Sequence, residues 1–286
     1  AKVDNWWWNL WNPPTCSFDA ARWLPALDQF PQFPELAPLS GSLLQALLKT
    51  LPAGKAPGRD GWTYGDFKRM PVELLSLLAL FYEVVEETGV WPELVGHSFV
   101  AMLPKGGTGT PDDHRPIVLL SVVYRIWAKV RMRMVRAGGS GVPRQFFAAG
   151  PGKSTEDAVG RVLLAAECVK TSEEAASIIL DIDKCYENVN HRKLQRASEQ
   201  HHFPLSVARM CIEMYRAART VAWNGVFGQM VQSNQTLAAG CSIALWLLQL
   251  LMLTPLDEFV FNLPRQVRLP EVYVDDASLM VVGGIG

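Results

Sequence analysis

Residues 272–281 read VYVDDASLMV, two arms rich in strand-forming residues around a pair of adjacent carboxylates. The arms predict a β-hairpin with Asp275 and Asp276 at its tip. Adjacent carboxylates repel each other unless a cation neutralises them, so such a tip is suited to hold a metal ion. Taken alone, the stretch is better explained as an ordinary turn, because Asp is common in turns. A second acidic strand decides between these interpretations.

That second strand is predicted at residues 177–183, where SIILDID places three apolar residues directly before Asp181. Because side chains alternate along a strand, Asp183 is expected on the same face as Asp181. Carboxylates from two strands can hold two hard divalent cations about 3.5–4 Å apart, as nucleotidyl transfer requires. One cation lowers the pKa of an attacking 3′-hydroxyl, and the other holds the triphosphate and the leaving pyrophosphate. An all-oxygen site favours Mg²⁺.

The remaining sequence predicts a mixed α and β fold around these two acidic segments. Helices are expected, from periodicity and capping residues, at 40–50, 71–88, 121–135, 155–170, 191–201 and 205–217. Strands are expected at 99–103 and 115–119, and a hairpin over 219–237 turns at Asn224-Gly225 or Phe227-Gly228. Residues 237–253 are apolar but interrupted by Gly240, Ser242 and Gln249, which favours a buried helix over a membrane span.

Composition indicates a globular protein with an uneven charge distribution. Of 286 residues, 49% are hydrophobic and 19% are charged, which excludes wholesale disorder. The net charge is −1, yet residues 105–161 hold ten Lys and Arg against four Asp and Glu, so a basic surface is expected beside an acidic one. The five cysteines are scattered without zinc-binding spacing, and no signal peptide is present, so reduced thiols in an intracellular protein are expected.

One predicted helix, at 121–135, aligns basic residues at spacings of three and four: Arg125, Lys129, Arg133 and Arg136. A solvated face and a phosphate-tracking face explain this stripe equally well.

Residues 1–50 form a Trp- and Pro-rich extension with little periodicity, expected to be irregular up to residue 40. Half of the ten tryptophans lie there, namely Trp6, Trp7, Trp8, Trp11 and Trp23. Three consecutive tryptophans cannot share one helix face, so some must meet another surface. Packing against the body of the protein is favoured over stacking on nucleic-acid bases.

Residues 273–276, YVDD, are similar to the signature of reverse transcriptases, especially those of non-LTR retrotransposons and group II introns. Further segments follow in that family's order. The loop 55–61, KAPGRDG, resembles an early fingers motif, and VAMLPK at 100–105 with HRPI at 114–117 resembles the strand pair that delivers basic residues to the triphosphate. Residues 145–158 and 181–191 resemble the next block and the first catalytic block. The resemblance implies a right-hand polymerase with fingers at 51–175 and a palm at 176–286, its antiparallel sheet backed by helices.

Roles for individual residues are also implied by the resemblance. The catalytic residues would be Asp181, Asp275 and Asp276, which together with Ile182 would form the site of two Mg²⁺ ions, Mn²⁺ being the alternative. The substrate-binding residues would be Lys105 and Arg115 at the triphosphate, Tyr186 beneath the sugar, and Gly240. A ring at Tyr186 would block a 2′-hydroxyl and so select deoxynucleotides; otherwise Tyr186 is a core aromatic residue.

The implied function is that of an RNA-directed DNA polymerase core, with an RNA template, a DNA primer and deoxynucleoside triphosphates as partners and no membrane. The chain begins with Ala and ends in a Gly-rich stretch after the YVDD segment, so we expect a piece of a polyprotein whose thumb, and potentially an endonuclease, lie elsewhere. Ala239 stands where the family usually has Gln, and Glu187 where many members have Asp. The alternatives are a catalytically silent domain retained for RNA binding and, disfavoured by Tyr186, an RNA-directed RNA polymerase.

Overall fold

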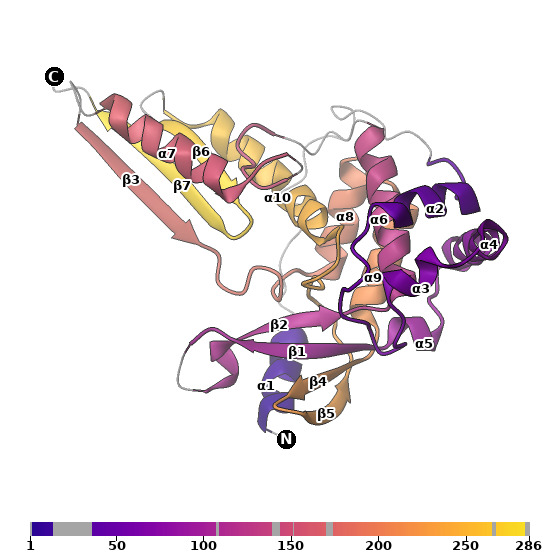
Figure 1. The fold of residues 1–286 in the computed structure, drawn as a ribbon. Helices are drawn as coiled ribbons and strands as arrows, with labels where there is room; N and C mark the ends of the chain where they lie inside the picture. Colours follow the sequence, from indigo (N-terminus) through magenta and orange to yellow (C-terminus); the bar gives the residue numbers. More distant parts are fainter. Residues whose placement is uncertain are drawn as a thin grey trace.

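Two β-sheets flank a helical body in the computed structural model (Figure 1). The structure describes residues 2–13, 36–106, 109–138, 144–150, 152–169, 174–264 and 267–283. The two ends of the chain lie far apart, the N-terminus beside the four-stranded sheet and the C-terminus at the far tip of the three-stranded sheet (Figure 1). Helices and sheets are thus mixed as predicted, and the α+β class is confirmed.

Capping residues mark the ends of several helices in the helical body. Its helices are α2 (Gly41–Lys49), α3 (Tyr64–Lys68), α4 (Val72–Thr88), α5 (Glu93–Gly96), α6 (Val122–Ala137), α8 (His191–Gln200), α9 (Leu205–Arg216) and α10 (Ala244–Phe261). Ser40 and Ser121 accept hydrogen bonds from the first-turn amides of α2 and α6. Gly89, with φ of 73°, ends α4 in the left-handed conformation.

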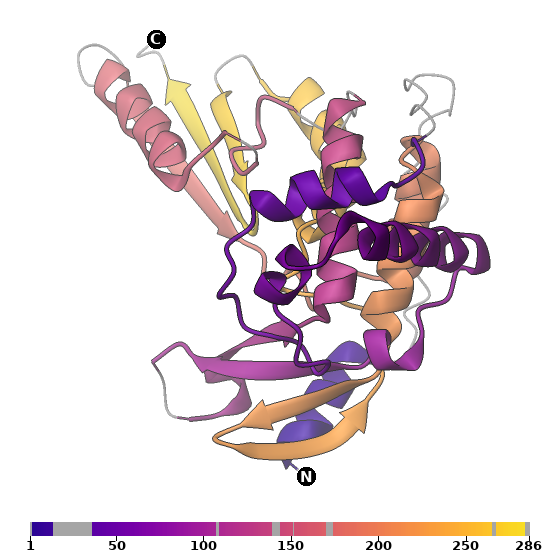
Figure 2. The same ribbon diagram turned by 45° about the vertical axis from the view of Figure 1, so that its right-hand side comes forward.

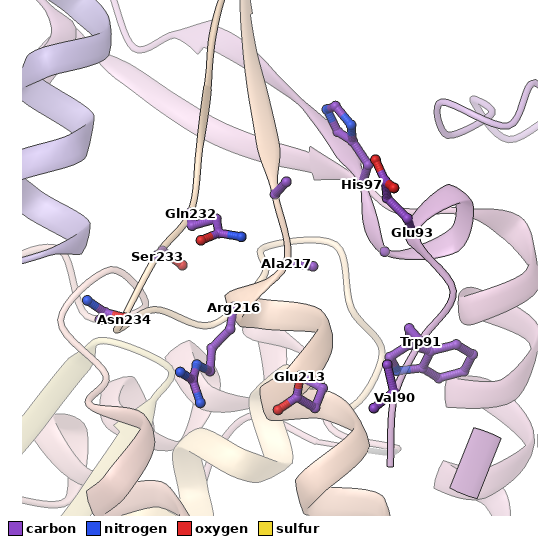
Figure 3. Close-up of a pocket in the computed structure, with 12 residues that line it drawn as sticks. Val90, Trp91, Glu93, His97, Glu213, Arg216, Ala217, Gln232, Ser233 and Asn234 are labelled. Carbon is purple, nitrogen blue, oxygen red and sulfur yellow. The ribbon is translucent and has the colours of Figure 1, made fainter. Parts of the chain in front are cut away.

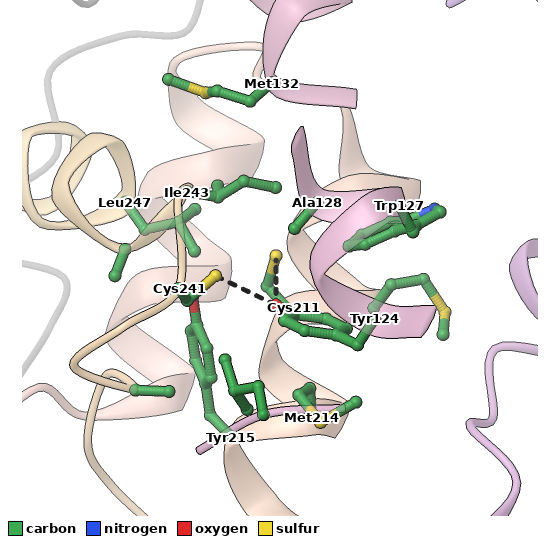
Figure 4. Packing of buried hydrophobic residues seen from close by; sticks show 14 of the residues in the cluster. Tyr124, Trp127, Ala128, Met132, Cys211, Met214, Tyr215, Cys241, Ile243 and Leu247 are labelled. Atoms are coloured by element: carbon green, nitrogen blue, oxygen red, sulfur yellow. Dashed lines mark hydrogen bonds between the residues drawn. The ribbon is translucent and has the colours of Figure 1, made fainter. Parts of the chain in front are cut away.

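Aromatic and sulfur-containing side chains fill the centre of this body. The Tyr124 hydroxyl donates to Cys211 Sγ at 3.5 Å and lies 3.2 Å from Cys241 Sγ (Figure 4). Trp127 packs edge-on against Trp91 with ring centroids 5.4 Å apart. The buried Cys211 and Cys241 are free thiols, as expected. This centre joins α6 and α9 to the segment that precedes α10.

Helix α10 begins later and ends later than the predicted buried helix at 237–253. By length and composition it is the one helix in the described residues that could cross a membrane, and 44% of its apolar window is buried inside the protein. Leu247 and Leu250 are fully buried, whereas Phe261 at the end of the helix is 88% exposed. The prediction of burial therefore holds for the first half of the helix and fails for its last turns.

The four-stranded sheet consists of β1 (Ser98–Pro104), β2 (His114–Leu119), β4 (Arg219–Trp223) and β5 (Val226–Val231), in the order β2-β1-β4-β5. Strand β1 pairs antiparallel with β2 and parallel with β4. The hairpin of β4 and β5 turns at Asn224 and Gly225, whose φ values of 50° and 77° suit a primed two-residue turn. The first of the two predicted turn positions is therefore confirmed.

The N-terminal extension is not irregular where the structure describes it. Helix α1 (Lys2–Trp11) packs against β5 and the short 3₁₀ helix η3 (Pro111–Asp113). Trp7 and Trp11, four residues apart on one helix face, are 2% and 1% exposed. The predicted irregularity is wrong for this segment, because burial of two large rings stabilises a helix that weak periodicity did not announce. Trp23 lies outside the described residues.

The three-stranded sheet consists of β3 (Glu174–Asp181), β7 (Asp276–Gly283) and β6 (Val267–Tyr273), in the order β3-β7-β6, and all its pairs are antiparallel. Helix α7 (Thr155–Val169) lies beside it, as both views show (Figures 1 and 2). Strand β3 ends at Asp181, so Asp183 lies beyond it with an 85% exposed side chain. The predicted strand is therefore two residues too long at this end, although Asp181 and Asp183 still line one pocket.

Candidate active site

The hairpin tip that joins β6 to β7 is tight and strained. Tyr273 pairs with Asp276, which leaves Val274 and Asp275 as the two turn residues. Val274 has φ of 60°, a conformation that a β-branched side chain rarely adopts. The Ile182 amide donates to the Asp275 carbonyl at 3.0 Å. The tip is therefore fixed to the first residue after β3.

This geometry gathers the predicted carboxylates at one end of the three-stranded sheet. Asp181 is the cross-strand partner of Asp276, and Asp275 is adjacent. Burial raises the pKa of Asp276, and the neighbouring Asp275 and Asp181 raise it further. Like charges in such positions destabilise a sheet unless a cation neutralises them, and carboxylate oxygens are the donors that Mg²⁺ prefers. Among the described residues, however, no three Asp, Glu, His or Cys side chains are already grouped as a metal site.

A pocket of about 400 Å³ lies between this sheet end and the four-stranded sheet. Asp181, Ile182 and Asp275 line it from one side. Lys105 and Arg115 line it from the ends of β1 and β2. The structure thus brings the predicted metal ligands and the predicted triphosphate contacts to one cavity, although they are far apart in sequence.

Two of the predicted residues lie just outside the pocket lining. Asp276 does not line the pocket, but it pairs with Asp181 and follows Asp275, both of which do. Gly240 has φ of 119°, and a Cβ there would lie 2.9 Å from the Val118 carbonyl oxygen. The Val118 amide donates to the Ala239 carbonyl at 2.9 Å, and Ala239 does line the pocket. Gly240 therefore permits a close approach of its loop to β2.

Tyr186 lines the pocket and also packs against the body core. Its carbonyl accepts from the Leu237 amide at 2.8 Å, which fixes the residue beside the loop that leads to α10. Burial raises the pKa of Tyr186 to about 12, so the phenol is neutral at physiological pH. The position suits both predicted interpretations, a ring beside a substrate and a ring in the core.

Comparison with known proteins identifies the family. The family model described as "Reverse transcriptase (RNA-dependent DNA polymerase)" matches residues 103–283, which include every predicted site residue. The chain belongs to the reverse transcriptase family. It is 25% identical over 150 residues to the "Probable RNA-directed DNA polymerase from transposon BS" of Drosophila melanogaster. It is 28% identical over 164 residues to the "RNA-directed DNA polymerase from mobile element jockey" of the same organism.

These alignments cover 50% and 54% of the chain but only 17% and 18% of the two relatives. The chain therefore spans less than a fifth of either protein. Both relatives support the predicted non-LTR type of reverse transcriptase.

The pocket of this reverse transcriptase domain contains residues that sequence reasoning missed. Lys184 has φ of 47°, and its Nζ lies 2.9 Å from Asp112 Oδ1 and 5.2 Å from the centroid of the Trp6 ring. Trp6, Trp7 and His114 also line the cavity. Lys184 could have been found in the sequence, because it is a cation only three residues after Asp181. Nothing in the sequence, however, connects Trp6 to residue 184.

Glu187, one of the two departures from the family pattern, is partly buried beside the same cations. Burial raises the pKa of Glu187, while Lys105, Lys184 and Arg219 oppose that rise. The carboxylate therefore takes part in the charge balance of the pocket.

The basic stripe of α6 lies outside this pocket, and its side chains are held by neutral groups. Arg125 donates to the Ala56 carbonyl at 2.8 Å, Arg133 donates to Thr50 Oγ1 at 2.6 Å, and Arg136 lies over the Trp246 ring. Burial and the neighbouring guanidinium groups lower the pKa of Lys129. Both predicted interpretations of the stripe stay open.

A second cavity of about 350 Å³ lies at the C-terminal end of α9 (Figure 3). Its polar lining includes His97, Glu213, Arg216 and Asn234. None of the predicted site residues lines it, which leaves the pocket at Asp181 as the candidate active site.

Proposed function

We propose that this chain forms the fingers and palm of an RNA-directed DNA polymerase, which transfers deoxynucleotides onto a primer 3′-hydroxyl. The observation that carries the proposal is the single pocket shared by Asp181, Asp275, Lys105 and Arg115. Nucleotidyl transfer needs carboxylates to hold divalent cations and basic groups to bind the triphosphate, and this cavity offers both.

The proposed roles follow from where each side chain lies. Asp181, Asp275 and Asp276, with the Ile182 carbonyl, would hold two Mg²⁺ ions. When bound, such ions supply the charge that lowers the pKa of the 3′-hydroxyl and neutralises the leaving pyrophosphate. Lys105 and Arg115 bind phosphate oxygens through charge-assisted hydrogen bonds. The ring of Tyr186 excludes a 2′-hydroxyl from the sugar position.

We assign residues 51–175 to the fingers and 176–286 to the palm. The four-stranded sheet joins the two parts, because β1 of the fingers pairs with β4 of the palm. The proposed template, primer and nucleotide partners, and the proposed thumb and endonuclease elsewhere in the protein, accord with the polymerase names of the two relatives.

A second candidate function is a catalytically silent domain that binds RNA. Ala239 favours it, because this residue lines the pocket and its methyl group cannot form the hydrogen bonds of the glutamine usual in the family.

Primer extension on an RNA template, with Mg²⁺ and deoxynucleotides, tests the proposal. The protein extended through its proposed thumb should extend the primer, and Asp275→Asn should lower the rate by on the order of 10³-fold because one ligand charge is lost. Glu87→Gln, which removes an exposed carboxylate on α4, serves as the control with unchanged activity. Extension that persists in Asp275→Asn would contradict the ligand assignment. RNA binding without any extension, by the protein extended through its proposed thumb, would favour the silent domain instead.

The sugar gate has a separate test in the same assay. Tyr186→Ala should lower the preference for deoxynucleotides over ribonucleotides by on the order of 100-fold, because the steric barrier to the 2′-hydroxyl is removed. Tyr186→Phe keeps the ring and should keep the preference. Unchanged selectivity in Tyr186→Ala would show that the residue serves only the core.

A further inference from the structure

Helix α1 is docked beside the pocket by specific backbone contacts. The Trp11 carbonyl accepts from the amides of Asn234 and Gln235, at 3.1 Å and 3.2 Å. Gln235 Nε2 donates to the Leu10 carbonyl at 2.8 Å, and Asn12 Nδ2 donates to the Gln232 carbonyl at 2.9 Å. The last turn of α1 is thereby fixed to the segment after β5, and the helix presents a defined face to the pocket.

The three consecutive tryptophans of α1 have three different environments. Trp7 is 2% exposed and packs edge-on against Trp6 with ring centroids 4.5 Å apart. Trp6 is only partly buried and lines the pocket. Trp8 is 47% exposed and does not line the pocket. Trp7 therefore anchors α1 to the protein, whereas the less buried ring of Trp6 faces the cavity.

The ring of Trp6 contacts a cation of the pocket. Lys184 Nζ lies 5.2 Å from its centroid, within the range of a cation–π interaction. The same Nζ lies 2.9 Å from Asp112 in η3 and 3.7 Å from Asp183. Lys184 therefore connects α1, the β1–β2 connection and the segment that follows β3.

Charge makes this lysine important to an anionic substrate. The carboxylates that line the pocket outnumber its Lys and Arg side chains: Asp112, Asp181, Asp183, Glu187 and Asp275 against Lys105, Arg115 and Lys184. A triphosphate carries several negative charges, so losing one of three cations weakens its binding markedly.

We propose that Trp6 is a positioning residue of the nucleotide pocket, whose ring holds the Lys184 ammonium where it binds the triphosphate together with Lys105 and Arg115. This inference rests on the proposed function, since it names a further determinant of the same site. It also gives the Trp-rich N-terminal segment a task in substrate binding that needs no stacking on a base.

Equilibrium binding of Mg²⁺–dTTP to the full 286-residue chain, measured by titration calorimetry, tests the inference. Trp6→Ala should raise the Kd by roughly 3- to 30-fold, the range expected for a partly desolvated cation–π contact. Trp8→Ala makes the same substitution two residues away and should leave the Kd unchanged. Trp6→Phe keeps a smaller ring and should give an intermediate Kd, which also decides the question if Trp6→Ala does not fold.

A double-mutant cycle separates positioning from simple packing. If Trp6 acts through Lys184, then Lys184→Gln alone raises the Kd and adding Trp6→Ala raises it little further. If the two substitutions instead raise the Kd by independent factors that multiply, the inference is overturned. Equal effects of Trp6→Ala and Trp8→Ala on the Kd would also overturn it. Tighter binding in Trp6→Ala would also overturn it, because the ring would then obstruct the pocket.

Primer extension by the unsubstituted chain keeps the two proposals distinguishable. Extension with a KM for dTTP that Trp6→Ala leaves unchanged would reject the inference and leave the polymerase function standing. In the reverse case, a chain that does not extend primers but binds Mg²⁺–dTTP more tightly than its Trp6→Ala variant would lose the polymerase function and keep the role of Trp6. Absence of any Mg²⁺–dTTP binding would reject both.

Discussion

The helical body and the three-stranded sheet are held together in different ways. In the body, side chains such as Ile126 and Leu247 are fully buried among aromatic and sulfur-containing neighbours. In the sheet, strand β3 leaves Ile179 at 74% exposure and Leu180 at 53%. Both regions carry strongly apolar sequences, yet the body buries the apolar side chains of its centre completely, whereas β3 leaves its own largely exposed.

The body is therefore expected to determine stability, whereas the three-stranded sheet carries the carboxylates of the candidate site. The carboxylates lie where β3 and the β6–β7 hairpin meet, in the region with the less buried apolar surface. Their positions depend on backbone pairing, since Asp181 faces Asp276 and the Ile182 amide binds the Asp275 carbonyl. The wall that faces them across the pocket comes from the four-stranded sheet, with Lys105 and Arg115 at the ends of β1 and β2. Substitutions in the body should therefore lower stability, whereas substitutions at the sheet end should mainly change the positions of the carboxylates.

The largest expected difference comes from one substitution made in both regions. Ile126→Ala should lower the free energy of unfolding by about 2–5 kcal/mol, because it leaves a cavity in a fully packed core. Ile179→Ala should cost at most about 1 kcal/mol, mainly through the lower strand propensity of Ala. Urea unfolding of both variants measures the two values. Equal costs would show that β3 is covered in the folded protein and would remove the contrast.

Local sequence patterns were sufficient to locate most of both regions. The β6–β7 hairpin, strand β3 and the longer helices of the body were predicted because their signals are local, as with Ser40 before α2 or Asn224-Gly225 between β4 and β5, whereas the short helices α3 and α5 were not predicted. Strand β3 stopped short of the prediction because Lys184, three residues after Asp181, has a positive φ that ends the extended backbone. Asp183 therefore lies beyond the strand, although it lines the same pocket as Asp181.

The parts that could not be predicted depend on contacts between distant segments. Helix α1 is stabilised by burial of Trp7 and Trp11 against the four-stranded sheet, and its C-terminal end is bound by residues near 234. The spacing of four between these tryptophans was a usable signal, but the surface that buries them was not visible in the sequence. The pairing of Trp6 with Lys184 is hidden for the same reason. The family resemblance could not supply it either, since the matched region begins at residue 103.

A smaller contrast concerns low pH, at which protonation of a buried group should destabilise the body but protonation of a carboxylate should stabilise the hairpin tip. In the body, burial lowers the pKa of His191 to about 4, and its Nε2 donates to the Thr236 carbonyl at 2.8 Å while the buried Nδ1 has no hydrogen-bond partner among the described residues. At the hairpin tip, the pKa of Asp276 is raised instead, so protonation there relieves repulsion.

The sign for His191 follows from its two states. The unfolded chain protonates near its ordinary pKa of about 6.5, whereas the folded protein resists protonation down to about 4. The contribution of His191 to stability is therefore fully present above about pH 6.5. Below that pH, this one group lowers the free energy of unfolding by about 1.4 kcal/mol per pH unit. His191→Gln keeps a donor for Thr236 and removes the titration, so its free energy of unfolding should fall less steeply between pH 6.5 and 4.5. Urea unfolding at a series of pH values measures both slopes. A slope equal to that of the unsubstituted protein would mean that His191 is protonated in the folded state, and the acid sensitivity of the body would then lie elsewhere, with the buried His201 as the next group to test.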